Sequence, residues 1–155
     1  MSENDRIIVG TPIPKIGAVT AGERYTVVVT WRDGREESID IAPIILSFRT
    51  FRPLRDDSEL WAGVRVDEYG SAIRWSDDMD MANYTLDRLA EAGRPMSRED
   101  FRSWMKRHGL TVDTAAPVLN LSRRQVAAFS SGEKPVDRTI KLACRGYDAI
   151  MGIAA

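Results

Sequence analysis

The chain contains very little cysteine and histidine. Cys144 is its only cysteine and His108 its only histidine among 155 residues. One cysteine excludes a disulfide within the chain, and one residue of each type is too few for a Cys/His zinc site. We therefore expect no disulfide, no metal and no cofactor. No nucleophile–base pair, phosphate-binding loop or metal motif is apparent either, which disfavours an enzyme.

Long apolar runs are also missing. No segment approaches the roughly 18 consecutive apolar residues that a membrane-spanning helix needs, and the first residues, MSENDR, are polar. Hydrophobic residues nevertheless make up 43% of the chain, enough to form packed cores. We expect a soluble, cytoplasmic protein that makes no membrane contact.

Charge is unevenly distributed along the chain. The formal net charge is -1, yet from Ala92 onward there are 11 basic and 6 acidic side chains, a net charge of +5. Residues 1–91 carry 11 basic and 17 acidic side chains, a net charge of −6. This asymmetry favours a basic module that meets phosphate, joined to an acidic module that does not.

The first portion, residues 1–92, has the pattern of an α+β domain with two β-hairpins and a helix. Short strands rich in β-branched and aromatic residues alternate with turn residues. The predicted strands are Lys15–Thr20, Tyr25–Trp31, Arg35–Ile41, Val64–Val66 and Ala72–Trp75. A helix is predicted from Met81 to Ala92, ended by Gly93 and Pro95. The domain boundary is therefore placed between residues 92 and 93.

The first portion contains several short sequence motifs in a defined order. They are Trp31, Asp33 and Gly34, then Asp40 to Pro43, Phe51 to Leu54, and Ile73 to Asp77. This order resembles a small bacterial family of domains of unknown function, although Asp78 and Met79 stand where that family commonly has glycine. The resemblance implies a compact α+β domain and no particular chemistry.

The second portion, residues 93–155, opens with a predicted capped helix. Ser97 can cap it, and apolar side chains then recur at helical spacing up to Gly109. They are Phe101, Trp104, Met105 and His108. We expect His108 to serve as a core or helix-end residue and Cys144 to be inert and buried.

The stretch from Val112 to Ser131 predicts two helices joined by a tight turn. Ala116 is small where the helices approach each other, and Asn120 tolerates the left-handed conformation of the turn. Ser122 and Gln125 form a capping box for the next helix, which Gly132 ends. This pattern resembles the helix-turn-helix of the Cro and phage-repressor family across Phe101 to Tyr147. The resemblance implies an all-α DNA-binding domain.

Pro117 conflicts with a helix that begins at Thr111, because a proline in a helix interior removes a backbone hydrogen bond. A later start, with Asp113 or Thr114 as the cap, would place Pro117 near the first turn, where it costs little. We therefore expect the later start.

The helix after the turn is the predicted recognition helix, and its exposed residues are the predicted DNA contacts. They are Ser122, Arg123, Arg124, Gln125, Ala127, Ala128 and Ser131. Arginine binds guanine in bidentate fashion or grips phosphate, so we expect Arg124 to contact a base and Arg123 a phosphate or a base. The alternative is that both arginines belong to a solvated face of a helical domain.

The last predicted helix runs from about Val136 to Met151. Its expected inner side carries Val136, Ile140, Ala143, Tyr147, Ile150 and Met151, with Leu142 nearby. Its final turns are also available to a second subunit, so we expect a homodimer. The sequence thus predicts a DNA-binding transcriptional regulator whose acidic domain contacts a protein, an effector or a second copy. The alternative is an antitoxin-like interaction module that keeps the fold without reading DNA.

Overall fold

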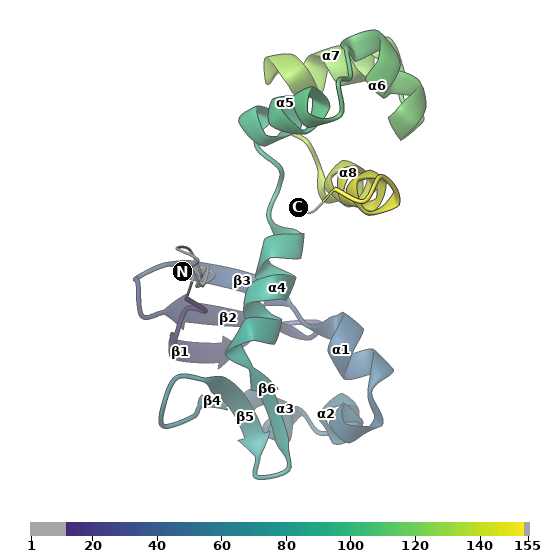
Figure 1. The fold of residues 1–155 in the computed structure, drawn as a ribbon. Coiled ribbons are helices and arrows are strands. Elements are labelled where there is room, and N and C mark those ends of the chain that lie inside the picture. The colour runs from purple at the N-terminus through teal and green to yellow at the C-terminus, as the bar shows by residue number, and fades with distance from the viewer. Residues whose placement is uncertain (1–11, 154–155) are drawn as a thin grey trace, which may run out of the picture. The chain divides into compact units, whose positions relative to one another are not determined.

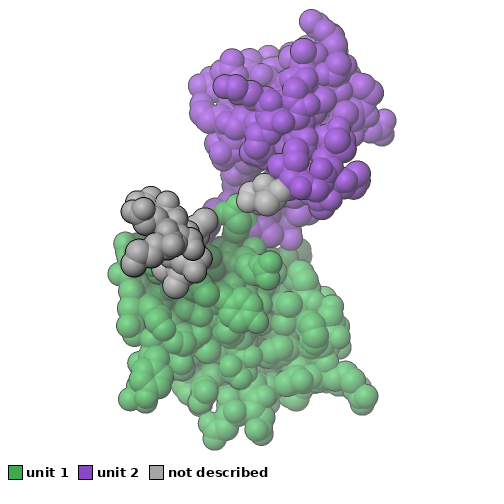
Figure 2. All heavy atoms as spheres, in the orientation of Figure 1, with its two compact units in different colours: residues 1–91 green, residues 92–155 purple. Residues whose placement is uncertain are grey.

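The computed structural model describes residues 12–153, and they form a mixed α+β structure (Figure 1). Two small antiparallel sheets come first, and helices follow them. The chain divides into two compact units, residues 1–91 and residues 92–155 (Figure 2). Among residues 12–153, no helix has the length and apolar character needed to cross a lipid bilayer.

The first sheet is a three-stranded meander. Its strands are β1 (Ile16–Ala21), β2 (Thr26–Trp31) and β3 (Glu36–Asp40), in the order β1-β2-β3. Alternate residues of β2 are buried, so one face of the sheet is apolar. The predicted hairpin of β2 and β3 is confirmed, and Gly34 supplies the positive φ of its turn.

Short helical segments lead from the first sheet to a second. They are α1 (Ala42–Ser47), η1 (Arg49–Phe51), α2 (Pro53–Asp56) and α3 (Ser58–Ala62). The second sheet contains β4 (Arg65–Val66), β5 (Ala72–Ser76) and β6 (Met79–Ala82). Its first hairpin was predicted, whereas its third strand was not.

The helix predicted from Met81 begins later in the structure. Strand β6 extends to Ala82, and α4 covers Asn83–Gly93. The physical reason lies in the pattern Met79–Asp80–Met81, in which buried and exposed side chains alternate with the period of a strand. The start at Met81 was therefore wrong, whereas the end near Gly93 is confirmed.

The tryptophans of the first unit belong to its hydrophobic core. Trp31 and Trp75 are buried, and Trp61 packs against this core half-buried. Trp61 stacks on Trp75 with ring centroids 5.8 Å apart, and its indole N–H donates to the Gly22 carbonyl at 3.0 Å. The buried indoles also have acceptors, because the Trp31 N–H donates to Glu37 Oε2 at 2.8 Å and the Trp75 N–H to the Trp61 carbonyl at 3.2 Å.

Four helices make up the second unit. They are α5 (Arg98–Arg107), α6 (Val112–Leu119), α7 (Arg123–Ser131) and α8 (Arg138–Ile150). Their core contains Phe101, Trp104, Met105, Ala115, Ala116, Val126, Phe129, Val136 and Cys144. The predicted cap of α5 is confirmed, because the Ser97 side chain accepts from the backbone N–H of Asp100 at 3.0 Å.

Val136, Ile140 and Tyr147 lie in or against the core as expected, but the rest of the buried side of α8 differs from the expected one. Lys141, Cys144 and Asp148 are buried, whereas Ile150 is 81% exposed. Leu142, Ala143 and Met151 are exposed as well. The hydrophobic pattern misassigned the face because both buried charges have partners: the Lys141 Nζ donates to the Arg94 carbonyl at 3.0 Å, and the Asp148 carboxylate meets His108.

Cys144 lies in the core of the second unit, where its backbone carbonyl accepts the indole N–H of Trp104 at 3.2 Å. Burial, with the Asp148 carboxylate nearby, raises the pKa of the Cys144 thiol to about 12. The thiolate is the reactive form, so this thiol is unreactive near neutral pH. Because the unfolded thiol ionises at lower pH, this group favours the folded state less as pH rises from 9 toward 12.

Gly146 lies inside α8, where an added Cβ would meet no atom within 4 Å. Glycine in a helix interior costs roughly 1 kcal/mol relative to alanine. We expect Gly146→Ala to raise the free energy of unfolding of the second unit by about 0.5–1 kcal/mol. Urea denaturation followed through the amide NMR signals of α8 measures it.

Gly132→Ala is the matched contrast, because Gly132 has a φ of +83° and its Cβ would lie 3.0 Å from Arg98 Cδ. This variant should be destabilised. A loss of stability at position 146 instead of a gain would show that another surface packs closely against α8 there.

Candidate nucleic-acid interface

The helix α6 begins earlier than the sequence suggested. Its cap is Thr111, whose side chain accepts from the Thr114 backbone N–H at 3.3 Å. The Thr114 hydroxyl in turn accepts from the Thr111 backbone N–H at 2.8 Å, which completes a capping box. The expected start at Asp113 or Thr114 was therefore wrong.

Pro117 consequently lies inside α6. Its missing N–H leaves the carbonyl of Asp113, four residues earlier, without the usual helical donor. Both residues are exposed, so water can replace that donor. The reciprocal cap at Thr111 supplies two hydrogen bonds to the same short helix, and this accounts for the early start.

Asn120 ends α6 in the left-handed conformation, with φ 53° and ψ 44°, as predicted. The Leu121 backbone N–H then donates to the Ala116 carbonyl at 2.9 Å and closes the turn. Ser122 follows immediately as the next cap. Three residues, Asn120, Leu121 and Ser122, thus suffice to redirect the chain from α6 into α7.

The predicted capping box of α7 is present. The Ser122 hydroxyl accepts from the Gln125 backbone N–H at 3.1 Å, and the Gln125 side-chain oxygen accepts from the Ser122 backbone N–H at 2.9 Å. Gln125 therefore uses its carbonyl oxygen locally and keeps its amide NH₂ for another partner. Val126 and Phe129 are buried and fix which side of α7 faces outward.

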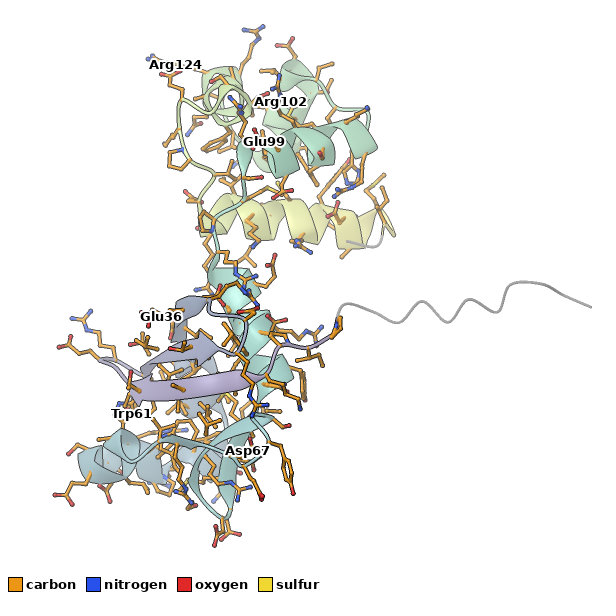
Figure 3. All side chains as sticks on the ribbon, turned by 90° about the vertical axis from the view of Figure 1, so that its left-hand side faces the viewer. Glu36, Trp61, Asp67, Glu99, Arg102 and Arg124 are labelled. Atoms are coloured by element: carbon orange, nitrogen blue, oxygen red, sulfur yellow. The ribbon has the colours of Figure 1, made fainter. Side chains whose placement is uncertain are left out.

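The two arginines at the start of α7 are in different situations. The Arg123 Nε donates to Asp113 Oδ1 at 2.5 Å, and these side chains are 71% and 68% exposed. In the described part of the chain, Arg124 has no hydrogen bond or ion pair. Figure 3 shows Arg124 projecting outward from α7. The sequence pattern did not distinguish these two states.

The other predicted contacts are less accessible. Ala127 and Ala128 are half-buried. Ser131 is exposed at the far end of α7, but its hydroxyl donates to the Ala128 carbonyl at 3.2 Å and accepts from the Glu133 backbone N–H at 3.3 Å. Ser131 is eight positions beyond Arg123, which at about 1.5 Å per residue is roughly 12 Å along the axis. The structure thus brings together Ser122, Arg123 and Arg124, and separates Ser131 from them.

Two arginines in a first helical turn oppose the helix dipole, whose N-terminal end is positive. The first turn of α7 has no acidic residue, whereas that of α5 has Glu99 and Asp100. At α5 the hydrogen bond from its own backbone N–H helps to lower the pKa of the Glu99 carboxyl. Arginine also begins α5 (Arg98) and α8 (Arg138), so the feature particular to α7 is its second arginine, Arg124, which helix stability does not explain.

A buried polar cluster holds α5 to α8. The His108 Nε2 lies 2.6 Å from Asp148 Oδ1, and the two side chains are only 2% and 4% exposed. Arg107 adds a contact of 3.4 Å to the second carboxylate oxygen. Sequence reasoning placed His108 correctly in the core and missed Asp148, because its partner lies 40 residues away. Among residues 12–153, no three His, Cys, Asp or Glu side chains are placed so that they could hold a metal ion.

Comparison with known proteins gives two matches. Residues 16–90 match DUF2442, a family described as proteins of unknown function. A solved structure from Nitrosomonas europaea ATCC 19718, named "Putative DNA Binding Protein", has 33% sequence identity, covers 88% of this chain and 87% of its own, and has a TM-score of 0.48. None of the curated proteins matches. The chain is therefore a relative of the Nitrosomonas europaea protein over nearly its whole length, and its first unit belongs to the DUF2442 family.

Proposed function

We propose that this chain is a transcriptional regulator that binds duplex DNA through the N-terminal turn of α7. In this proposal α6, the turn at Asn120 and α7 act as a helix-turn-helix of the Cro and phage-repressor type. The recognition residues are Ser122, Arg123 and Arg124, with Ala127 and Ala128 facing the groove.

Arg124, which is exposed at the capped start of α7 and has no partner among residues 12–153, carries this proposal. A cation in that place is unfavourable for the helix, and an exposed arginine at a helix start can enter the major groove. The small side chains that follow let α7 approach base edges. The net charge of +5 on residues 92–155 supplies attraction to phosphate. The name of the Nitrosomonas europaea relative also refers to DNA binding.

A homodimer belongs to the same proposal, because one recognition helix contacts only a few base pairs. Leu142 and Ile150 on α8, and Met151 at its C-terminal cap, are exposed and offer apolar surface to a second copy. Selection from a random duplex library with the full chain tests both points. We expect an enriched motif whose half-sites lie about 10 bp apart or a multiple of that. Failure to enrich any motif would count against sequence-specific binding, and a single half-site bound by a monomer would count against the dimer.

The same exposed apolar residues of α8 also favour a second candidate function, a protein-interaction module of the antitoxin-like type. The two candidate functions make opposite predictions for the effect of removing the Arg124 charge from α7. A DNA reader depends on Arg124, whereas an interaction module that uses α8 tolerates its loss.

A further inference from the structure

The ion pair between Asp113 and Arg123 joins the first turn of α6 to the first turn of α7. The residues are ten positions apart, and the Arg123 Nε lies 2.5 Å from Asp113 Oδ1. Both side chains are more than two-thirds exposed. Exposed pairs of this kind add little to stability, so the fold gives no strong reason for the pair.

The pair does determine how Arg123 is presented. Arginine has five N–H donors, one on Nε and two on each terminal nitrogen. Asp113 engages the Nε edge, and within residues 12–153 neither terminal nitrogen has a hydrogen bond or ion pair. Those two nitrogens have the spacing of the O6 and N7 acceptors of guanine, which arginine contacts in bidentate fashion.

The Asp113 carboxylate also makes phosphate an unfavourable target. It cancels the charge of Arg123 locally, and it would itself be repelled by a phosphate brought close to the pair. Arg124 has no such neighbour among the described residues. The two arginines therefore differ in the ligand chemistry that each can accept.

We propose that Asp113 is a positioning residue that orients Arg123 so that its terminal nitrogens read a guanine in the preferred duplex. This inference rests on the proposed function. It assigns Arg123 to a base, where the sequence had allowed either a phosphate or a base. Because the ion pair already holds the Arg123 side chain before DNA binds, less side-chain conformational entropy is lost on binding.

The test measures base preference for the full chain and its variants on duplexes with each base substituted in turn. Arg123→Ala should lower the preference for one guanine by about 5- to 150-fold. Asp113→Asn should lower the preference at the same base pair by about three- to tenfold, while binding to unrelated duplex becomes slightly tighter because a negative charge is lost. Asp113→Glu keeps the carboxylate and should restore part of the preference.

Asp100→Asn is the matched control, because Asp100 is also an exposed aspartate in a first helical turn. It should leave base preference unchanged. In an Arg123→Ala background, Asp113→Asn should have no further effect on that base pair. The inference is overturned if the parent shows a clear preference that Asp113→Asn leaves within about twofold. A parent without any base preference would instead contradict the proposed function itself.

Discussion

Arg124→Ala is expected to weaken binding to the preferred duplex by about 1–3 kcal/mol, which is roughly 5- to 150-fold. Arg124 is exposed and unpartnered in the described chain, so its guanidinium is available in full for a base edge. The loss should be concentrated at one base pair and should relax the preference there. Fluorescence anisotropy titrations with single-base-pair variants of the duplex measure it.

Two outcomes separate a base contact from a phosphate contact at Arg124. Loss of a phosphate contact would weaken every duplex evenly and reduce the slope of binding against salt by about 1. Arg88→Ala, an equal change of charge at an exposed position of α4, is the control. If Arg88→Ala reduced affinity as much as Arg124→Ala, the effect would be one of general charge.

Asp148→Ala is expected to lower the free energy of unfolding of the second unit. It leaves the buried His108 without its carboxylate partner and removes the contact with Arg107. A buried polar group left without a hydrogen-bond partner costs about 1–3 kcal/mol. Urea denaturation followed through amide NMR signals of α5 and α8 reports on this unit alone.

Two further variants complete that experiment. Asp148→Asn keeps one oxygen acceptor for His108 and should lose less stability than Asp148→Ala. Asp100→Ala removes an exposed aspartate and should change stability by less than about 1 kcal/mol. Equal stability of Asp148→Ala and the parent would show that the cluster does not hold α5 to α8.

The features of the second unit that the sequence predicted are local ones. The capping box of α7 joins residues three apart, and the turn at Asn120 depends on a single residue type, so both follow from short patterns. The hydrophobic periodicity of α5 likewise identified the buried Trp104. Each of these follows from rules that operate within one or two helical turns.

The features that were missed depend on residues distant in sequence. Lys141 and Asp148 are buried because Arg94 and His108 supply their partners, and no helical pattern contains that information. The pairing of Asp113 with Arg123 requires the geometry of the turn between α6 and α7. The late start predicted for α6 was wrong because it gave more weight to the cost of Pro117 inside the helix than to the reciprocal cap between Thr111 and Thr114.

The double variant Arg123→Ala, Arg124→Ala tests the central claim most directly, because both residues are exposed and oppose the helix dipole. Circular dichroism should show a folded chain at least as stable as the parent. Titrated against the selected duplex, this folded variant should lose its base preference and retain only weak, salt-sensitive binding. A folded double variant that binds the selected duplex as tightly as the parent would contradict DNA reading by α7.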